Sequence, residues 1–453
     1  MFDIAIIGGG PAGYVAAERA GAKGLKTVLF EKNKLGGVCL NEGCIPTKTL
    51  LYSAKIYDNA RHGDKYGLTI PEAGFDYAKI VGRKDRVVRR LVGGVGAKMK
   101  AHGVTVVQGE ATIKGGSEGN FEIGCGGESY RAAKILICTG STATIPPIEG
   151  MADAGEVLLT NREILDMKER PQSLVIIGGG VIGMEFASFF NSLGTTVTVI
   201  EMMPEILPGL DPEISAMLRD VYDKRGVVFN MSCKVVKVEP DGTVHYLRPD
   251  GSGETVHGER ILVSVGRRPV TQGLGLESVG VETERNAIKV DDRMRTNIPG
   301  VFAAGDVKGF SMLAHTASRE GEVVVNNLTG TDDVMSYRAI PSVVYTNPEV
   351  ACVGMSLEGA LKEGLDAVEV KLPMAYAGRF VAENEGANGL FKAVVDKGSE
   401  TVLGVSMLGN PSSEILYGAC MAIERRMTLA ELRRVVFPHP TVSEIFREAL
   451  FEV

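Results

Sequence analysis

The fold is decided near the N-terminus by the stretch Ile4-Ala5-Ile6-Ile7-Gly8-Gly9-Gly10-Pro11-Ala12-Gly13. A helix-like segment follows as far as Gly24, and a second apolar run then ends in an acid at Thr27-Val28-Leu29-Phe30-Glu31. Both apolar runs are short and bounded by turn signals, as buried parallel strands are. The order of strand, glycine turn, helix, strand and acid predicts a dinucleotide-binding βαβ unit.

A second copy of this order begins at Leu174-Val175-Ile176-Ile177-Gly178-Gly179-Gly180-Val181-Ile182-Gly183 and ends at Glu201. A single glycine-rich turn is weak support for a nucleotide site, because such turns are common between strands and helices. Two copies, each with its helix and acid in place, favour two nucleotide sites over ordinary turns. We therefore predict an α/β protein with two Rossmann-like domains, in which a flavin passes electrons to a nicotinamide.

The glycines and acids of the two units have separate tasks. The first glycine makes the tight turn, the second lets the backbone approach a pyrophosphate, and the third allows close helix–strand packing. The pyrophosphate then lies at a helix N-terminus, where free N–H groups favour negative charge. The glycines predicted for these tasks are Gly8, Gly10, Gly13, Gly178, Gly180 and Gly183. Glu31 and Glu201 are predicted to accept hydrogen bonds from ribose hydroxyls. No Lys or Arg follows Glu201 as far as Glu205, which favours NAD over NADP at the second site.

Composition limits the class of protein. The 453 residues carry a net charge of −7, which argues against a nucleic-acid partner, since such partners select a basic surface. No apolar stretch approaches the roughly 20 residues that span a bilayer, and the N-terminus has no signal-peptide pattern. Most of the seven cysteines are scattered, which fits a reducing cytoplasm. The cysteines expected to be small buried hydrophobic residues are Cys125, Cys138, Cys233, Cys352 and Cys420.

One cysteine pair is closely spaced, in Cys39-Leu40-Asn41-Glu42-Gly43-Cys44. The spacing differs from that of thioredoxin-like and zinc sites, and no further Cys or His cluster offers zinc ligands. Five residues of regular helix rise about 7.5 Å, whereas a disulfide needs Cα atoms within about 6.8 Å. We therefore expect an irregular helix, because Gly43 is flexible and Pro46 has no N–H to donate to the Glu42 carbonyl. A redox-active pair is favoured over two unrelated buried cysteines.

The stretch from Gly36 to Lys48 resembles the active-disulfide signature of the pyridine-nucleotide-disulfide oxidoreductases, and the resemblance covers essentially the whole chain. It implies FAD at the first unit, NAD at the second, and a C-terminal α+β dimerisation domain. It also implies a flavin contact at Asp306, which from its position alone could equally cap the next helix. With boundaries at Ile145-Pro146-Pro147 and near Ser336, the predicted domains are FAD-binding (1–145 and 266–336), NAD-binding (146–265) and interface (337–453).

The resemblance also assigns roles to residues around the cysteines. Cys39 is implied to exchange with the substrate and Cys44 to face the flavin. Lys48 and Glu185 are implied to form an ion pair beside the two cofactors, although the residues alone favour a surface lysine and a helix-start acid. Further cofactor-binding residues that it implies are Gly140, Gly266 and Ala314, with His315 in the same flavin-facing segment.

The C-terminal stretch Phe437-Pro438-His439-Pro440-Thr441-Val442-Ser443-Glu444 allows two interpretations. His439 could act as a general base that Glu444 orients. Alternatively, Thr441 and Glu444 have the spacing of a capping box at a helix start. The resemblance implies a His–Glu dyad that arrives from the partner subunit of a homodimer. Phe437-Pro438 departs from the smaller, more polar pair that usually precedes this histidine.

Within the family, the pattern is similar to that of enzymes that oxidise a dihydrolipoyl group with NAD. This implies lipoyl domains of a 2-oxoacid dehydrogenase, glycine cleavage or acetoin complex as partners. Alternative functions are another NAD(P)H-dependent flavin disulfide reductase, a diaphorase, or an assembly subunit of a multienzyme complex.

Overall fold

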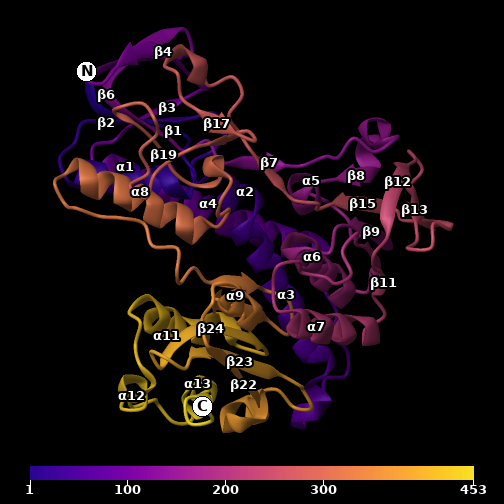
Figure 1. The fold of residues 1–453 in the computed structure, drawn as a ribbon. Coiled ribbons are helices and arrows are strands. Elements are labelled where there is room, and N and C mark those ends of the chain that lie inside the picture. The colour runs from indigo at the N-terminus through magenta and orange to yellow at the C-terminus, as the bar shows by residue number, and fades with distance from the viewer.

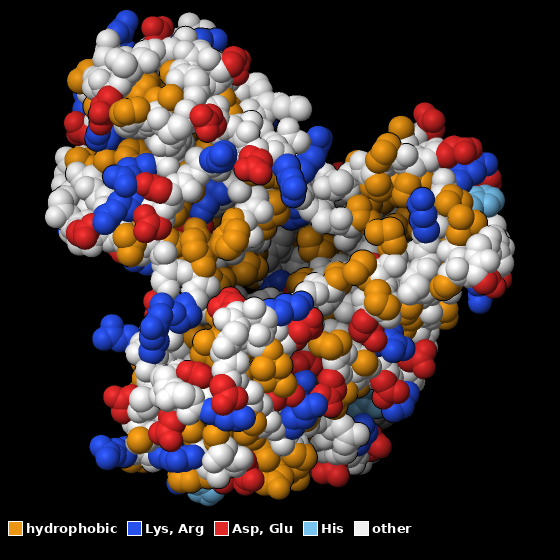
Figure 2. Space-filling view, in the orientation of Figure 1, with side chains coloured by type: hydrophobic (Ala, Val, Ile, Leu, Met, Phe, Trp, Pro, Cys, Tyr) orange, Lys and Arg blue, Asp and Glu red, His pale blue; other side chains and the backbone are white.

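The structure is a computed structural model that describes residues 1–453, and it has three lobes, each built on one large sheet (Figure 1). Two lobes carry parallel strands and the third is antiparallel. Figure 2 shows a hollow where the lobes meet. The predicted fold class, two Rossmann-like domains with a C-terminal α+β domain, is confirmed. No helix combines the length and the apolar character that crossing a membrane requires.

The first lobe holds a seven-stranded sheet in the order β3-β2-β1-β6-β5-β4, with β19 beside β6. Its strands are β1 (Phe2–Ile7), β2 (Thr27–Glu31), β3 (Thr105–Gln108), β4 (Ala111–Ser117), β5 (Asn120–Cys125), β6 (Glu128–Ile137) and β19 (Val301–Ala303). Its helices are α1 (Pro11–Ala22), α4 (Tyr77–Ala101) and α8 (Ala314–Leu328). A side chain at Gly321 of α8 would lie 2.6 Å from the Ala12 carbonyl oxygen, so these helices touch backbone to backbone.

The second lobe holds a parallel sheet in the order β11-β10-β9-β15-β8. Its strands are β8 (Leu158–Leu159), β9 (Ser173–Ile177), β10 (Thr196–Ile200), β11 (Val228–Asn230) and β15 (Arg260–Val263). Its helices are α5 (Asn161–Leu165), α6 (Val181–Ser192) and α7 (Pro212–Lys224). A small antiparallel sheet lies alongside and consists of β12 (Lys234–Val238), β13 (Thr243–Leu247) and β14 (Gly253–His257).

The third lobe holds an antiparallel sheet in the order β20-β21-β24-β23-β22. Its strands are β20 (Ser342–Val344), β21 (Val350–Gly354), β22 (Ala367–Pro373), β23 (Leu390–Asp396) and β24 (Thr401–Leu408). Its helices are α9 (Leu357–Lys362), α10 (Gly378–Glu383), α11 (Ser412–Glu424), α12 (Leu429–Leu432) and α13 (Glu444–Ala449). Cys352 and Cys420 of this lobe are only half-buried, which corrects the expectation that every scattered cysteine is buried.

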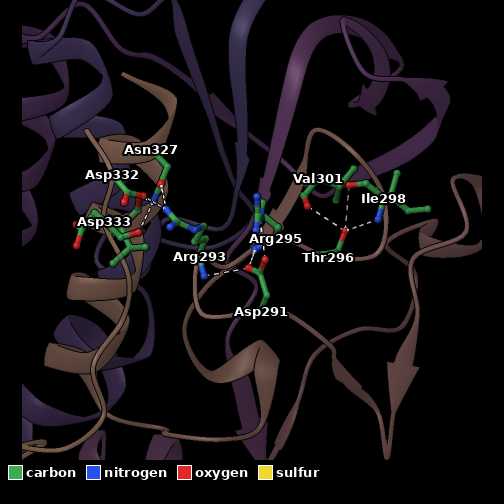
Figure 3. Close-up of polar contacts among 10 residues, drawn as sticks. Asp291, Arg293, Arg295, Thr296, Ile298, Val301, Asn327, Asp332 and Asp333 are labelled. Carbon is green, nitrogen blue, oxygen red and sulfur yellow. Dashed lines mark hydrogen bonds and ion pairs between the residues drawn. The ribbon is translucent and has the colours of Figure 1, made fainter. Parts of the chain in front are cut away.

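Two connections tie the lobes together. The chain leaves the first lobe at β7 (Ser141–Ala143) and returns at β16 (Arg267–Pro269), and these strands pair antiparallel. The chain leaves again after α8, where Arg293 contacts Asp332 and donates to Asn327 at 2.9 Å (Figure 3). The segment leading to the third lobe is therefore fastened to the first.

Candidate active site

The two glycine turns have nearly the same geometry. Gly8 and Gly178 have φ values of +108° and +104°, which side chains other than glycine's rarely adopt. A Cβ at Gly13 would lie 1.8 Å from the Gly8 carbonyl oxygen, and one at Gly183 would lie 2.1 Å from that of Gly178. These glycines are therefore fixed by close backbone contact.

The middle glycines are different, because space opens in front of them. A Cβ on Gly180 would meet no protein atom within 4 Å, and one on Gly10 would meet only the Gly37 Cα, at 3.9 Å. Each of these glycines is the N-cap of the following helix and has no side-chain cap. Open space before uncapped N–H groups fits a pyrophosphate, so the residues present fit FAD at the first turn and NAD at the second.

The two predicted acids hold their turns in the same way. Glu31 accepts a hydrogen bond from the Gly9 N–H at 2.8 Å, and Glu201 accepts one from the Gly179 N–H at 2.6 Å. Both carboxylates are buried at the ends of their strands. Each acid therefore contacts its glycine turn directly. A ribose attached to a pyrophosphate at that turn would lie next to the acid.

The cysteine pair lies where two helices meet at an angle. Helix α2 (Gly37–Glu42) carries Cys39, and α3 (Cys44–Arg61) begins at Cys44. Gly43 separates them with φ −148° and ψ −111°, which is neither helical nor extended. This break is the irregularity that the spacing predicts, and it brings the two thiols into hydrogen-bonding contact.

The two thiols differ in acidity. The hydrogen bond donated by the Cys39 thiol lowers the pKa of Cys44 to about 7; burial opposes this effect and the Lys48 ammonium adds to it. The same contact raises the pKa of Cys39, and burial raises it further. Cys44 is therefore the thiol that ionises first, and a thiolate is the reactive form of cysteine.

An ion pair joins the cysteine helix to the second glycine turn. The Lys48 Nζ lies 2.9 and 2.8 Å from the two carboxylate oxygens of Glu185 on α6. The backbone N–H of Tyr345 donates to the same carboxylate at 3.0 Å, and its ring faces the Lys48 ammonium at 4.6 Å. Burial lowers the pKa of Lys48, but the contacts with Glu185 outweigh burial, so the net pKa of Lys48 is raised.

Asp306 does not cap a helix. The helix after it, α8, begins at Ala314, and the Asp306 carboxylate accepts a hydrogen bond from the Ser141 hydroxyl at 2.5 Å. Burial raises the pKa of Asp306, against the effects of Ser141 and Arg267. This half-buried carboxyl fits a hydroxylated cofactor chain better than a capping role.

The remaining residues implied for the cofactors lie at turns and at a helix start. Gly140 and Gly266 have φ values of +70° and +111° and flank the β7–β16 ladder. Ala314 is the first residue of α8. Burial lowers the pKa of His315, which follows it.

His439 and Glu444 form a hydrogen-bonded pair away from the cysteines. The His439 Nδ1 lies 2.9 Å from one Glu444 oxygen, and the Thr441 N–H donates to the other at 2.9 Å. The capping box predicted as the alternative is not formed, because the N-cap of α13 is Ser443, which makes no side-chain cap; only the bond from the Thr441 N–H to Glu444 is present. The His439 side chain is 80% exposed, and α13 lies at the far end of the third lobe from α2 (Figure 1).

Sequence reasoning missed three contacts at this site. Tyr345 holds Glu185, Ser141 holds Asp306, and Asn161 donates to the Glu42 carbonyl between the cysteines. None lies near its partner in sequence. The only local signal was Pro46, which leaves the Glu42 carbonyl without its helical partner.

Comparison with known proteins places this geometry in a family. Residues 2–321 match the pyridine nucleotide-disulphide oxidoreductases, and residues 340–450 match the dimerisation domain of that family. The chain therefore belongs to the pyridine nucleotide-disulphide oxidoreductase family, whose cofactors are FAD and NAD.

Two curated relatives and two solved structures are similar to this chain over almost its whole length. The chain is 40% identical to a dihydrolipoyl dehydrogenase of Thermus scotoductus and 37% identical to one of Chlamydia muridarum, covering 99% of this chain and 96% of each relative. Among solved structures it is similar to LpdA of Mycobacterium tuberculosis, with a TM-score of 0.91, 27% identity and 99% of both chains covered. It is also similar to the HOCl-induced flavoprotein disulfide reductase RclA of Escherichia coli, with a TM-score of 0.87, 28% identity and 100% of both chains covered.

Proposed function

We propose that the chain acts as a dihydrolipoyl dehydrogenase, which oxidises protein-bound dihydrolipoamide to lipoamide and reduces NAD+ to NADH. The observation that carries this proposal is the ion pair between Lys48 and Glu185. Lys48 lies one turn after Cys44, and Glu185 lies two residues after the last glycine of the nicotinamide turn. The pair therefore holds the thiol centre and the nicotinamide site together.

The chemistry at the cysteines begins with the substrate dithiol. His439 of the partner subunit takes the proton of one substrate thiol, and the thiolate attacks the Cys39 sulfur of the oxidised pair. A mixed disulfide forms, and the Cys39–Cys44 bond breaks with its electron pair on Cys44. The second substrate thiol attacks the sulfur bonded to Cys39, the substrate disulfide forms, and Cys39 leaves with that thiol's proton.

Residues of this chain can also supply the leaving group, stabilise its thiolate and provide the histidine for a partner subunit. The lowered pKa of Cys44 makes it the better leaving group, and the Lys48 ammonium stabilises its thiolate. A bound FAD supplies the two-electron chemistry that links the reduced cysteines to NAD+. The exposed His439–Glu444 pair supports a homodimer in which each site uses the other chain's histidine. Cytoplasmic lipoyl domains of a multienzyme complex are the proposed partners.

The test is NAD+ reduction measured with dihydrolipoamide, dithiothreitol and glutathione side by side. We expect rapid turnover with dihydrolipoamide only, and near-complete loss in Cys39→Ser and Cys44→Ser proteins. Cys125→Ser, in β5 of the first lobe, is the matched control and should stay active. Turnover that survives in Cys44→Ser would instead identify a diaphorase.

A further inference from the structure

The carbonyl of Glu42 is a backbone acceptor inside the cysteine loop that lacks its ordinary partner. Residue 46, which would donate to it in a continuous helix, is Pro46 and has no N–H. The Asn161 side-chain amide fills this gap and donates to the Glu42 carbonyl at 2.7 Å. Asn161 is buried at the start of α5, 119 residues along the chain from Glu42. A side chain of the second lobe therefore completes the cysteine loop.

The same amide continues into a chain of hydrogen bonds. The Asn161 carbonyl oxygen accepts from Arg267 at 3.3 Å, and Arg267 donates to the Ser141 hydroxyl at 2.7 Å and to the Ser141 carbonyl at 2.8 Å. The Ser141 hydroxyl in turn donates to Asp306 at 2.5 Å. Every donor and acceptor is consistent in direction, so the contacts form one continuous path from Glu42 to Asp306.

Burial and nearby charges bind Arg267 to this path. Arg267 lies near the acids Asp306 and Glu42, which raise its pKa, and near the like-charged Arg162, which lowers it. Burial lowers the pKa of Arg267, so the guanidinium depends on its hydrogen bonds for the solvation it has lost. The Glu42 carboxylate itself turns outward to Arg162, at 2.8 Å, and leaves only its carbonyl to the path.

We propose that Asn161 and Arg267 are positioning residues that fix the loop between Cys39 and Cys44 relative to the Asp306 carboxylate. The proposal deepens the proposed function, because it concerns the same cysteine centre. A fixed loop keeps the two sulfurs at bonding reach and so favours the disulfide over the dithiol. Loss of the Asn161 contact frees Glu42, lets the sulfurs separate and makes the disulfide easier to reduce.

The experiment measures the dithiol–disulfide equilibrium of the FAD-loaded protein in glutathione buffers, with iodoacetamide trapping and mass analysis of Cys39 and Cys44. For Asn161→Leu we expect the equilibrium to shift toward the dithiol by about tenfold, or roughly 30 mV. Arg267→Lys keeps one donor and should give a smaller shift in the same direction.

Two neighbours provide matched controls. Arg162→Gln removes only the ion pair to the Glu42 carboxylate, and Arg268→Gln changes an exposed residue beside Arg267. Both should keep the equilibrium of the unmodified protein. Should Asn161→Leu fail to fold, Asn161→Asp decides, because it keeps the acceptor for Arg267 and loses the donor to Glu42.

An unchanged equilibrium in a folded Asn161 variant overturns the proposal, as does an equal shift in Arg162→Gln. The measurement uses glutathione rather than dihydrolipoamide. If the unmodified protein failed to oxidise dihydrolipoamide, the proposed function would fall, yet the Asn161 result would stand by itself.

Discussion

The ammonium of Lys48 donates to both carboxylate oxygens of Glu185, at 2.9 and 2.8 Å, across 137 residues of sequence. The two groups act on the Cys44 thiol in opposite directions, since the Lys48 charge lowers its pKa and the Glu185 charge raises it. The pair therefore contributes to the acidity of the Cys44 thiol, beside the larger effects of the Cys39 hydrogen bond and burial, and it joins two lobes.

The opposite effects of Lys48 and Glu185 on the pKa of Cys44 give the first prediction. With a pKa of about 7, the Cys44 thiolate forms as the pH rises through 7 and is about one-tenth populated at pH 6. Lys48→Met should move this titration to higher pH and Glu185→Gln to lower pH. The pH dependence of Cys44 alkylation by iodoacetamide in the reduced protein measures both shifts. Lys55→Met, two turns further along α3, is the control and should leave the titration unchanged; shifts of the same sign in the first two variants would contradict the assignment.

Two glycines of the second glycine turn, the site proposed for NAD, provide a contrasting pair of substitutions. Gly183→Ala places a Cβ 2.1 Å from the Gly178 carbonyl oxygen and should lower the free energy of unfolding by about 1–3 kcal/mol. Gly180→Ala meets no protein atom within 4 Å, so stability should stay within about 0.5 kcal/mol. The new methyl group occupies the space proposed for the pyrophosphate, and NADH affinity should fall by at least about tenfold. Urea unfolding and NADH titration separate the two effects, and tight NADH binding by Gly180→Ala would place the pyrophosphate elsewhere.

Hybrid dimers test the partner histidine. Cys44→Ser and His439→Gln homodimers should both be inactive with dihydrolipoamide. Subunits mixed after reversible dissociation should regain roughly a quarter of the native activity, because half of the dimers are hybrids with one intact site. Two differently tagged chains allow the hybrid to be purified and assayed directly. No recovery in the purified hybrid would mean that each site uses its own histidine.

A buried ion pair between Lys308 and Glu320 in the first lobe gives the fourth prediction. The Lys308 Nζ lies 2.5 Å from Glu320, whose other oxygen accepts from the Gly305 N–H at 2.6 Å. Lys308→Met leaves the Glu320 carboxylate, which is 1% exposed, without its cation and should cost about 3–5 kcal/mol of unfolding free energy.

The double variant Lys308→Met/Glu320→Gln removes both charges and should recover part of that loss. Urea denaturation measures all three proteins, with the exposed Lys289→Met as the control. A double variant no more stable than Lys308→Met would contradict charge pairing as the main stabilising effect of this contact.

The order of short motifs in the sequence was enough to predict most of the fold. The turns at Gly8 and Gly178 and the acids at Glu31 and Glu201 follow a fixed order over about 30 residues, so periodicity and punctuation identify them. The helix break at Gly43 followed from the reach of a disulfide, because a regular helix separates the two cysteines too far.

Long-range contacts could not be predicted in the same way. Tyr345 reaches Glu185 over 160 residues and Asn161 reaches Glu42 over 119, and each forms only when separate lobes pack together. Spacing alone also gave two interpretations of Glu444. The structure shows the contact of Glu444 with His439 but no capping box, since the N-cap of α13 is Ser443 and only the bond from the Thr441 N–H to Glu444 is made.

The position of β19 has a consequence for biosynthesis. This strand completes the first sheet beside β6, yet it is encoded after the whole second lobe. A ribosome therefore releases every residue of the second lobe before the sheet of the first lobe can close. The inserted lobe is able to fold first, and the host lobe must hold β1, β2 and β6 open while it waits for residues 301–303.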